Sequence, residues 1–141
     1  MFTPVSMRSV NSYRAVAVET SVSTANPHEL VSLLFEGLLQ SLALAKGSIQ
    51  TADMPTKGRA IGRAVRILEE GLKAGLDEAR GGELAVNLRT LYDFCIVRLT
   101  ESNLRNDAGM VNEVIQLIRP VAESWSQIRD QVVVQPRSAL N

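Results

Sequence analysis

Apolar side chains recur every three or four residues along most of this chain, which is the spacing of one face of an α-helix. Turn signals divide the pattern into four segments, and no β-type alternation appears between them. We expect helices at about residues 27–50, 54–79, 83–104 and 107–130. Because the connections are short, neighbouring helices should run antiparallel. The pattern therefore predicts an all-α fold, an up-down-up-down four-helix bundle.

Residues at the ends of these segments support the boundaries. Asn26 is a favoured N-cap residue, Pro27 suits the first helical position, and Glu29 can bond back to the backbone N–H of the cap. Gly81 and Gly82 follow the second segment, and glycine commonly ends a helix. These signals separate the first three helices from their neighbours.

The fourth segment contains a proline. Pro120 removes one i→i−4 hydrogen bond and should kink the helix near Gln116. The apolar positions Val114, Ile118 and Val121 stay in phase across the proline. We therefore expect one kinked helix.

The two ends of the chain lack a long helical pattern. Residues 1–25 are expected to form an N-terminal strap, or cap segment, on a bundle that comprises residues 26–130. Tyr13 and Val16 would either anchor this strap to the bundle or hold it over a partner-binding surface. Residues 131–141 are expected to form a flexible, disordered tail.

The composition restricts the classes of function. With 141 residues, the chain can form one domain with a sizeable core that needs no disulfide or metal. Fifteen basic residues balance fifteen acidic ones, so no net charge attracts nucleic acid or anionic membranes. The N-terminal residues lack the apolar region of a signal peptide, and no stretch approaches the roughly 20 apolar residues of a transmembrane helix. We expect a cytoplasmic protein that binds no nucleic acid and does not insert into membranes.

One apolar stripe on each helix is sufficient to fill the core of a bundle. In chain order the four stripes are Val31, Leu34, Phe35, Leu38, Leu42, Ala45 and Ile49; Ile61, Val65, Leu68, Leu72 and Leu76; Leu84, Leu88, Leu91, Tyr92, Cys95 and Leu99; and Val111, Val114, Ile115, Ile118, Val121, Ala122 and Trp125. Apolar residues outside these stripes need a separate explanation.

Three helices carry a second apolar strip outside the expected core. Nearly all members of the strip on the second helix are small, which would let the backbone of another helix approach closely. The strips are Ala60, Ala64, Ile67, Gly71 and Ala74 on the second helix, Val86, Thr90, Phe94 and Val97 on the third, and, more weakly, Leu30, Leu33, Gly37 and Leu44 on the first. Large apolar patches on a soluble protein usually mark an interaction surface. The strips of the second and third helices therefore predict a groove that binds an amphipathic helix of a partner.

Other occupants of these strips stay open at this point. The N-terminal strap could cover them, or a second copy of the chain could do so as a homodimer. In that case the protein would be a structural helical subunit of a permanent homo-oligomer, which light scattering on the purified protein would detect.

Catalytic and metal-binding patterns are weak. Cys95 lies on the expected core stripe, where a free cysteine behaves as a small inert hydrophobe. His28 is the only histidine, so the chain lacks a second Cys or His for a metal site and offers no base close in sequence to Cys95. No P-loop and no GxGxxG motif occur. We expect neither an enzyme nor a cofactor.

Several short motifs follow one another in a specific order between Tyr13 and Trp125. They are Asn26-Pro27-His28-Glu29-Leu30-Val31, Leu34-Phe35-Glu36-Gly37, Gly71-Leu72-Lys73-Ala74-Gly75-Leu76-Asp77, Gly81-Gly82-Glu83, Asn87-Leu88 with Leu91-Tyr92-Asp93-Phe94, and Asn103-Leu104-Arg105-Asn106-Asp107. In this order they resemble the FliS family of cytosolic chaperones for flagellin export. One departure is Pro120, which falls where the family usually continues its helix smoothly.

This resemblance implies a binding function. A chaperone of this family binds the C-terminal segment of flagellin, prevents its premature polymerisation, and assists its delivery to the flagellar type III export gate. The family's N-terminal segment covers part of the binding surface, which would assign that role to Tyr13 and its neighbours. A segment that folds on binding must offset its ordering entropy with wide apolar contact. The strips on the second and third helices would supply that contact.

Overall fold

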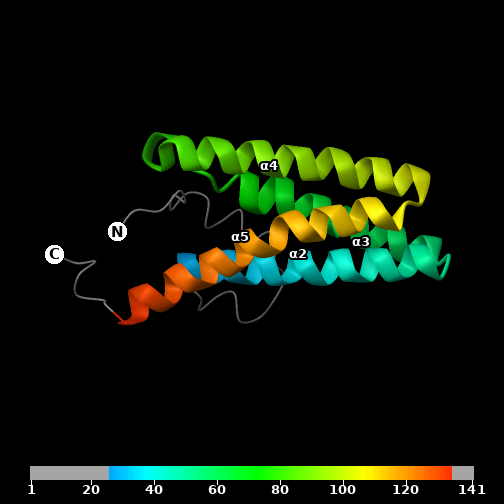
Figure 1. The fold of residues 1–141 in the computed structure, drawn as a ribbon, viewed down its shortest axis with the longest axis horizontal. Helices are drawn as coiled ribbons and strands as arrows, with labels where there is room; N and C mark the ends of the chain where they lie inside the picture. Colours follow the sequence, from blue (N-terminus) through cyan, green and yellow to red (C-terminus); the bar gives the residue numbers. More distant parts are fainter. Residues whose placement is uncertain (1–25, 135–141) are drawn as a thin grey trace.

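The structure, a computed structural model, describes the backbone of residues 26–134 and the side chains of residues 26–128. In chain order the helices are α2 (Pro27–Gln50), α3 (Met54–Arg66), the π-helix η2 (Ile67–Lys73), α4 (Glu78–Arg105) and α5 (Ala108–Val134). Helix α3 and η2 form one continuous rod. Successive rods run in opposite directions along a common long axis (Figure 1). The predicted all-α, antiparallel bundle is thus confirmed.

The start of α2 has the predicted capping box. The Asn26 side chain accepts a hydrogen bond from the Glu29 backbone N–H over 2.8 Å, and the Glu29 carboxylate accepts from the Asn26 N–H over 3.0 Å. Two backbone donors that the first turn would leave unpaired are thereby satisfied. Asp53 caps α3 in a similar way, because its carboxylate accepts from the Thr56 N–H over 3.3 Å.

The connection between the second and third helices differs from the prediction. The second rod ends at Lys73 rather than residue 79, and α4 begins at Glu78 rather than residue 83. Asp77 provides the N-cap, because its carboxylate accepts from the Arg80 N–H over 3.3 Å. Gly82, with φ of 55° and ψ of −135°, is non-helical and kinks α4 between a first turn at residues 78–81 and the long helix that follows, so the predicted break at the glycine pair lies inside α4. Asp77 therefore starts an extra turn that the sequence analysis did not predict, and the long part of α4 begins after Gly82, close to the predicted start at residue 83.

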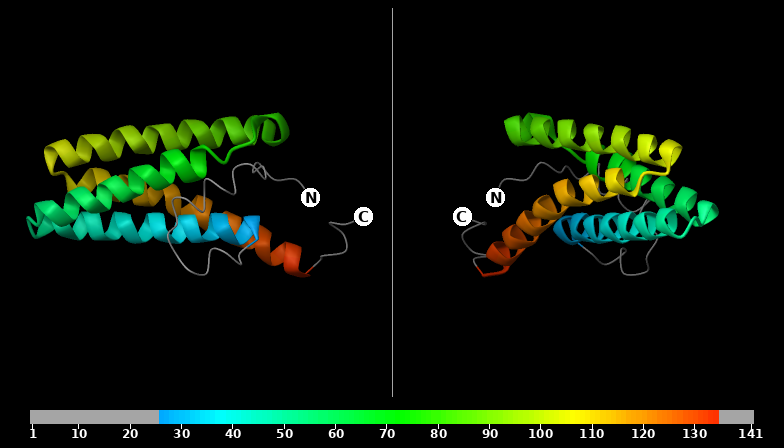
Figure 2. Two further views of the ribbon diagram at one scale, coloured as in Figure 1. Left: turned by 180° about the vertical axis from the view of Figure 1, so that it is seen from behind. Right: turned by 45° about the vertical axis from the view of Figure 1, so that its right-hand side comes forward.

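Helix α5 also extends further than predicted. It continues to Val134, four residues beyond the expected end, and includes the first residues of the expected tail. Pro120 lies inside this one helix, as predicted. Its C-terminal half lies beside the N-terminal end of α2 (Figure 2).

The predicted core stripes account for most of the interior. Helix α2 packs against α3 and α5, and α4 packs against α5, α3 and η2. The largest fully buried side chains are Leu30, Leu34, Leu38, Leu42, Ile67, Leu68, Leu99, Ile118, Val111, Val114 and Cys95. The prediction that Leu84 belongs to the core is wrong, since 51% of its surface is exposed. Leu84 belongs to the N-terminal end of α4, which extends beyond the end of η2 (Figures 1 and 2).

Helix α2 is long and apolar enough to cross a membrane by length and composition alone, contrary to the reading of the sequence. Half of its apolar window is buried inside the bundle. Its buried side packs against α3, η2 and α5.

Candidate functional site

The outward face of α4 carries a row of exposed residues that we call the α4 outer stripe. It consists of Val86, Thr90, Phe94, Val97 and Leu104. Phe94 is 43% exposed, Val97 65% and Leu104 83%. At 100° per residue these positions lie opposite the buried face of the same helix, which contains Tyr92, Cys95 and Leu99. Helix α4 therefore has a core face and an apolar outer face.

Leu104 was not among the predicted site residues. It lies seven positions after Val97, two helical turns along the same face. The prediction treated it as the last residue of its helix, whereas α4 continues to Arg105. The spacing from Val97 was the signal that could have identified it.

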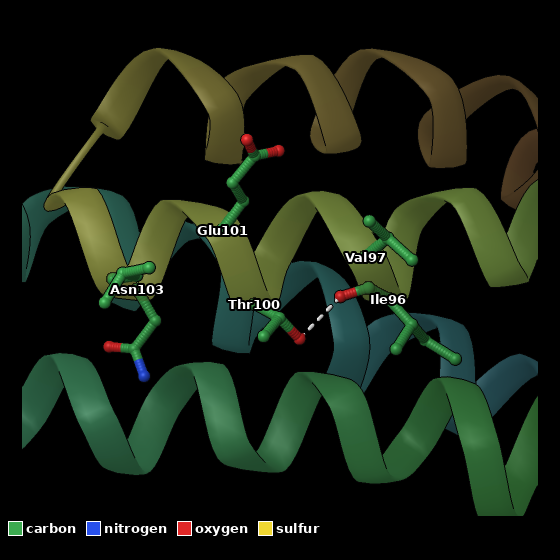
Figure 3. Close-up of a pocket in the computed structure, with 6 residues that line it drawn as sticks. Ile96, Val97, Thr100, Glu101 and Asn103 are labelled. Atoms are coloured by element: carbon green, nitrogen blue, oxygen red, sulfur yellow. Dashed lines mark hydrogen bonds between the residues drawn. The ribbon is translucent and has the colours of Figure 1, made fainter.

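A shallow hollow of about 580 Å³ lies at the C-terminal end of the stripe. Its lining residues all come from α4: Ile96, Val97, Thr100, Glu101, Asn103 and Leu104 (Figure 3). The Thr100 hydroxyl donates to the Ile96 carbonyl oxygen over 2.8 Å, and Thr90 donates to the Val86 carbonyl oxygen over 3.1 Å. Both hydroxyls are thus satisfied by their own helix, so the two threonines add methyl surface to an apolar face.

The charged neighbours of the stripe are paired with residues of this chain. Lys73 Nζ lies 2.7 Å from Asp93 Oδ1 and 3.2 Å from Glu69 Oε1. The hydrogen bonds to Asp93 and then Glu69 raise the pKa of Lys73. Arg89 forms an ion pair with Glu78 near the start of the helix. A partner would therefore meet apolar surface bordered by charges that are already balanced.

The small-residue strip on α3 and η2 is mostly buried, whereas the sequence analysis predicts it to be exposed. Four of its members are buried and cannot form the floor of an external groove, so the prediction is wrong for Ala60, Ala64, Ile67 and Gly71. Ala74 is the only member of the predicted strip that is exposed.

Helix α2 covers this strip. A Cβ placed on Gly71 would lie 3.1 Å from Leu34 Cδ1, and one placed on Gly37 would lie 3.5 Å from Ile67 Cδ1. Arg63 also reaches across, since its Nη1 donates to Ser41 Oγ over 3.0 Å. The small residues on both helices thus allow α2 to approach the second rod closely, in place of the predicted external partner.

The candidates for chemistry have structural positions. Cys95 is fully buried, and burial, with a smaller contribution from Glu113, raises the pKa of its thiol to about 12. It is therefore a neutral thiol near pH 7 and a poor nucleophile. His28 stacks on Trp125 with ring centroids 4.2 Å apart, and Trp125 Nε1 donates to the His28 carbonyl oxygen over 3.1 Å. Within the part of the chain that the structure describes, no cluster of His, Cys, Asp and Glu could hold a metal ion.

Of the predicted third-helix strip, the structure brings Val86, Thr90, Phe94 and Val97 together on one exposed face. Tyr13 and Val16 lie outside the described residues, so the strap stays a prediction.

Comparison with known proteins identifies relatives over nearly the whole chain. The sequence pattern of the family described as "Flagellar protein FliS" matches residues 9–132. The chain is 43% identical to the flagellar secretion chaperone FliS of Salmonella typhimurium over 126 residues, 89% of this chain and 93% of that protein. It is 43% identical to the flagellar secretion chaperone FliSB of Pseudomonas aeruginosa, covering 86% and 96% of the two chains. The Bacillus subtilis flagellar secretion chaperone FliS is 34% identical over 77% of this chain and 80% of its own length.

Proposed function

The chain belongs to the FliS family of flagellar secretion chaperones, and from this premise we propose that its client is flagellin. The protein binds the C-terminal segment of newly made flagellin in the bacterial cytosol. It prevents premature polymerisation of that segment and assists its delivery to the flagellar type III export apparatus. It acts by binding alone, without catalysis.

The α4 outer stripe is the single observation that supports this proposal most directly. From Val86 to Leu104 the stripe spans 18 helical rises, or about 27 Å. The inward face of the same helix packs in the core, so the stripe is not needed to complete the bundle. An exposed apolar row of this length suits the apolar face of a partner helix.

The physical logic is that of coupled folding and binding. A client segment that is unstructured before binding loses conformational entropy when it becomes ordered. Contact with Phe94, Val97, Leu104 and the neighbouring hollow would offset that loss by removing apolar surface from water. While bound, the client's own apolar face is unavailable for assembly with other flagellin molecules.

A charge on the stripe tests the proposal. Val97→Asp should weaken binding of a fluorescein-labelled peptide of the flagellin C-terminal segment by about tenfold or more, because a carboxylate would have to lose water against an apolar partner. Leu44→Asp is the matched control, since Leu44 is 54% exposed but lies on α2. Both variants should keep the wild-type helical circular dichroism and melting temperature, and Leu44→Asp should keep wild-type affinity.

Wild-type affinity in Val97→Asp would remove the stripe from the binding site. Light scattering on the same proteins tests the alternative of self-association. A stable wild-type oligomer that Val97→Asp dissociates would assign the stripe to contacts between copies of this chain.

A further inference from the structure

Arg98 borders the α4 outer stripe and joins it to α5. Its guanidinium carbon lies 5.3 Å from the centroid of the Phe94 ring, one helical turn earlier. On the other side, Arg98 Nε lies 3.0 Å from Glu113 Oε1, and Nη2 donates to Glu113 Oε2 over 3.4 Å. Both carboxylate oxygens of an α5 residue thus face a cation that lies over an exposed aromatic ring.

A second carboxylate restrains the same guanidinium. Arg98 Nη1 lies 3.6 Å from Glu101 Oε1, and the other oxygen of Glu101 lies 3.4 Å from Arg105 Nη2. These side chains are between about one third and two thirds exposed, so each pair alone contributes little to folding stability. Together they hold the guanidinium between α4 and α5 through one hydrogen bond to Glu113 and charge contacts to both carboxylates, although the buried Nε donates no hydrogen bond of its own.

We propose that Arg98, held by Glu113, is a positioning residue that fixes the Phe94 ring in its client-binding orientation. The inference rests on the proposed function, because Phe94 belongs to the α4 outer stripe. A cation over one face of the ring favours a single ring position through the attraction between the cation and the π-electrons. The rest of the ring, which is 43% exposed, is then presented to the client. A side chain ordered before binding loses less entropy when the client arrives.

This arrangement gives α5 a part in recognition through Glu113, which acts on the ring by way of Arg98. It also explains why arginine suits the position. A planar guanidinium can stack on a ring and still pair with two carboxylates, whereas the compact ammonium group of lysine cannot present such a fork.

A double-mutant cycle tests whether Arg98 acts through Phe94. Affinity for the labelled flagellin C-terminal peptide is measured for the wild type, Arg98→Met, Phe94→Leu and the double variant. Methionine keeps an apolar stem and removes the charge and the fork. We expect Arg98→Met to weaken binding about three- to tenfold when Phe94 is present. In the Phe94→Leu background it should cause no further loss, because there is no ring left to position.

Two further variants sharpen the test. Glu113→Gln should weaken binding in the same direction as Arg98→Met, because it removes the charge that holds the guanidinium. Arg98→Lys, which keeps the charge but lacks the planar fork, should have an affinity between those of Arg98→Met and the wild type. Melting temperatures measured alongside separate these effects from general destabilisation, which would act equally in both backgrounds.

An equal loss in the wild-type and Phe94→Leu backgrounds would overturn the inference, since Arg98 would then act on the client directly or on the whole fold. Unchanged affinity in Arg98→Met, with Val97→Asp still impaired, would overturn the inference and leave the proposed function standing. Failure of the wild type to bind the peptide would overturn the proposed function and the inference with it.

Discussion

The second apolar strip of α3 and η2 resembles the α4 outer stripe in sequence, but the first is mostly buried in the fold and the second is exposed. Both lie outside the core stripe that was assigned to their helix. In the structure, Ala64 and Ile67 are buried against α2, whereas Val97 and Leu104 are exposed. The difference arises because the second rod packs against both α2 and α4, whereas the outer face of α4 has no neighbour among the described residues. A surplus apolar face is therefore an interaction surface only where the topology leaves it uncovered.

The two faces of α4 allow a sensitive test of this contrast. Cys95 should react with a small alkylating reagent at pH 8 about a thousandfold more slowly than an unperturbed thiol, because a pKa of about 12 leaves very little thiolate. Its rate should rise with pH towards 12. In the Val97→Cys variant, the new thiol should react at an ordinary rate. Mass spectrometry of the labelled protein distinguishes the two sites, and rapid labelling of Cys95 in the folded protein would contradict its burial.

Truncation of each strip should affect stability very differently. Ile67→Ala should lower the free energy of unfolding by about 3 kcal/mol, because the side chain is 2% exposed and its loss leaves a cavity against α2. Val97→Ala should change it by less than about 0.5 kcal/mol, as is usual at exposed positions. Urea unfolding followed by circular dichroism measures both. Similar losses in the two variants would show that the α4 outer stripe is also packed.

Two glycines of the second rod provide the finest comparison. Gly62→Ala should raise the free energy of unfolding by about 0.5–1 kcal/mol, because nothing lies within 4 Å of the added Cβ and alanine has the higher helix propensity. Gly71→Ala should bring no such gain, since its Cβ would lie 3.1 Å from Leu34 Cδ1. Thermal melts of both variants measure the difference. A gain at Gly71 equal to that at Gly62 would mean that α2 can move away without cost.

The end signals illustrate how local information succeeds and fails. The Asn26 capping box formed as predicted because its donors and acceptors lie within four residues of one another. The helix boundary near Gly82 was only partly predicted, because two local signals act there. Asp77 caps a first turn that starts at Glu78, and the positive φ of Gly82 interrupts the helix before its long part begins. The extra turn was missed because its start depends on where η2 ends.

The site was partly predictable for the same reason. The periodicity of α4 identified Val86, Thr90, Phe94 and Val97 as one face, because four residues in phase need no tertiary information. The proposed role of Arg98 beside these residues could not be predicted from the sequence. Its role depends on Glu113, which lies 15 residues later on another helix and comes close only when α5 folds back.

The sequence by itself determined the helical class, the number of rods, the cap of α2 and the family, since propensity, periodicity and short motifs are properties of neighbouring residues. Only the tertiary structure decided which of the surplus apolar faces remained exposed. Gly37 on α2 and Gly71 on η2 lie where the two helices come close, so these parts of the two strips pack against each other, whereas Leu44 of the α2 strip stays exposed. Helix α4 was left with an apolar face beyond the needs of the core, because burial depends on the arrangement of whole helices and not on the pattern of any one of them.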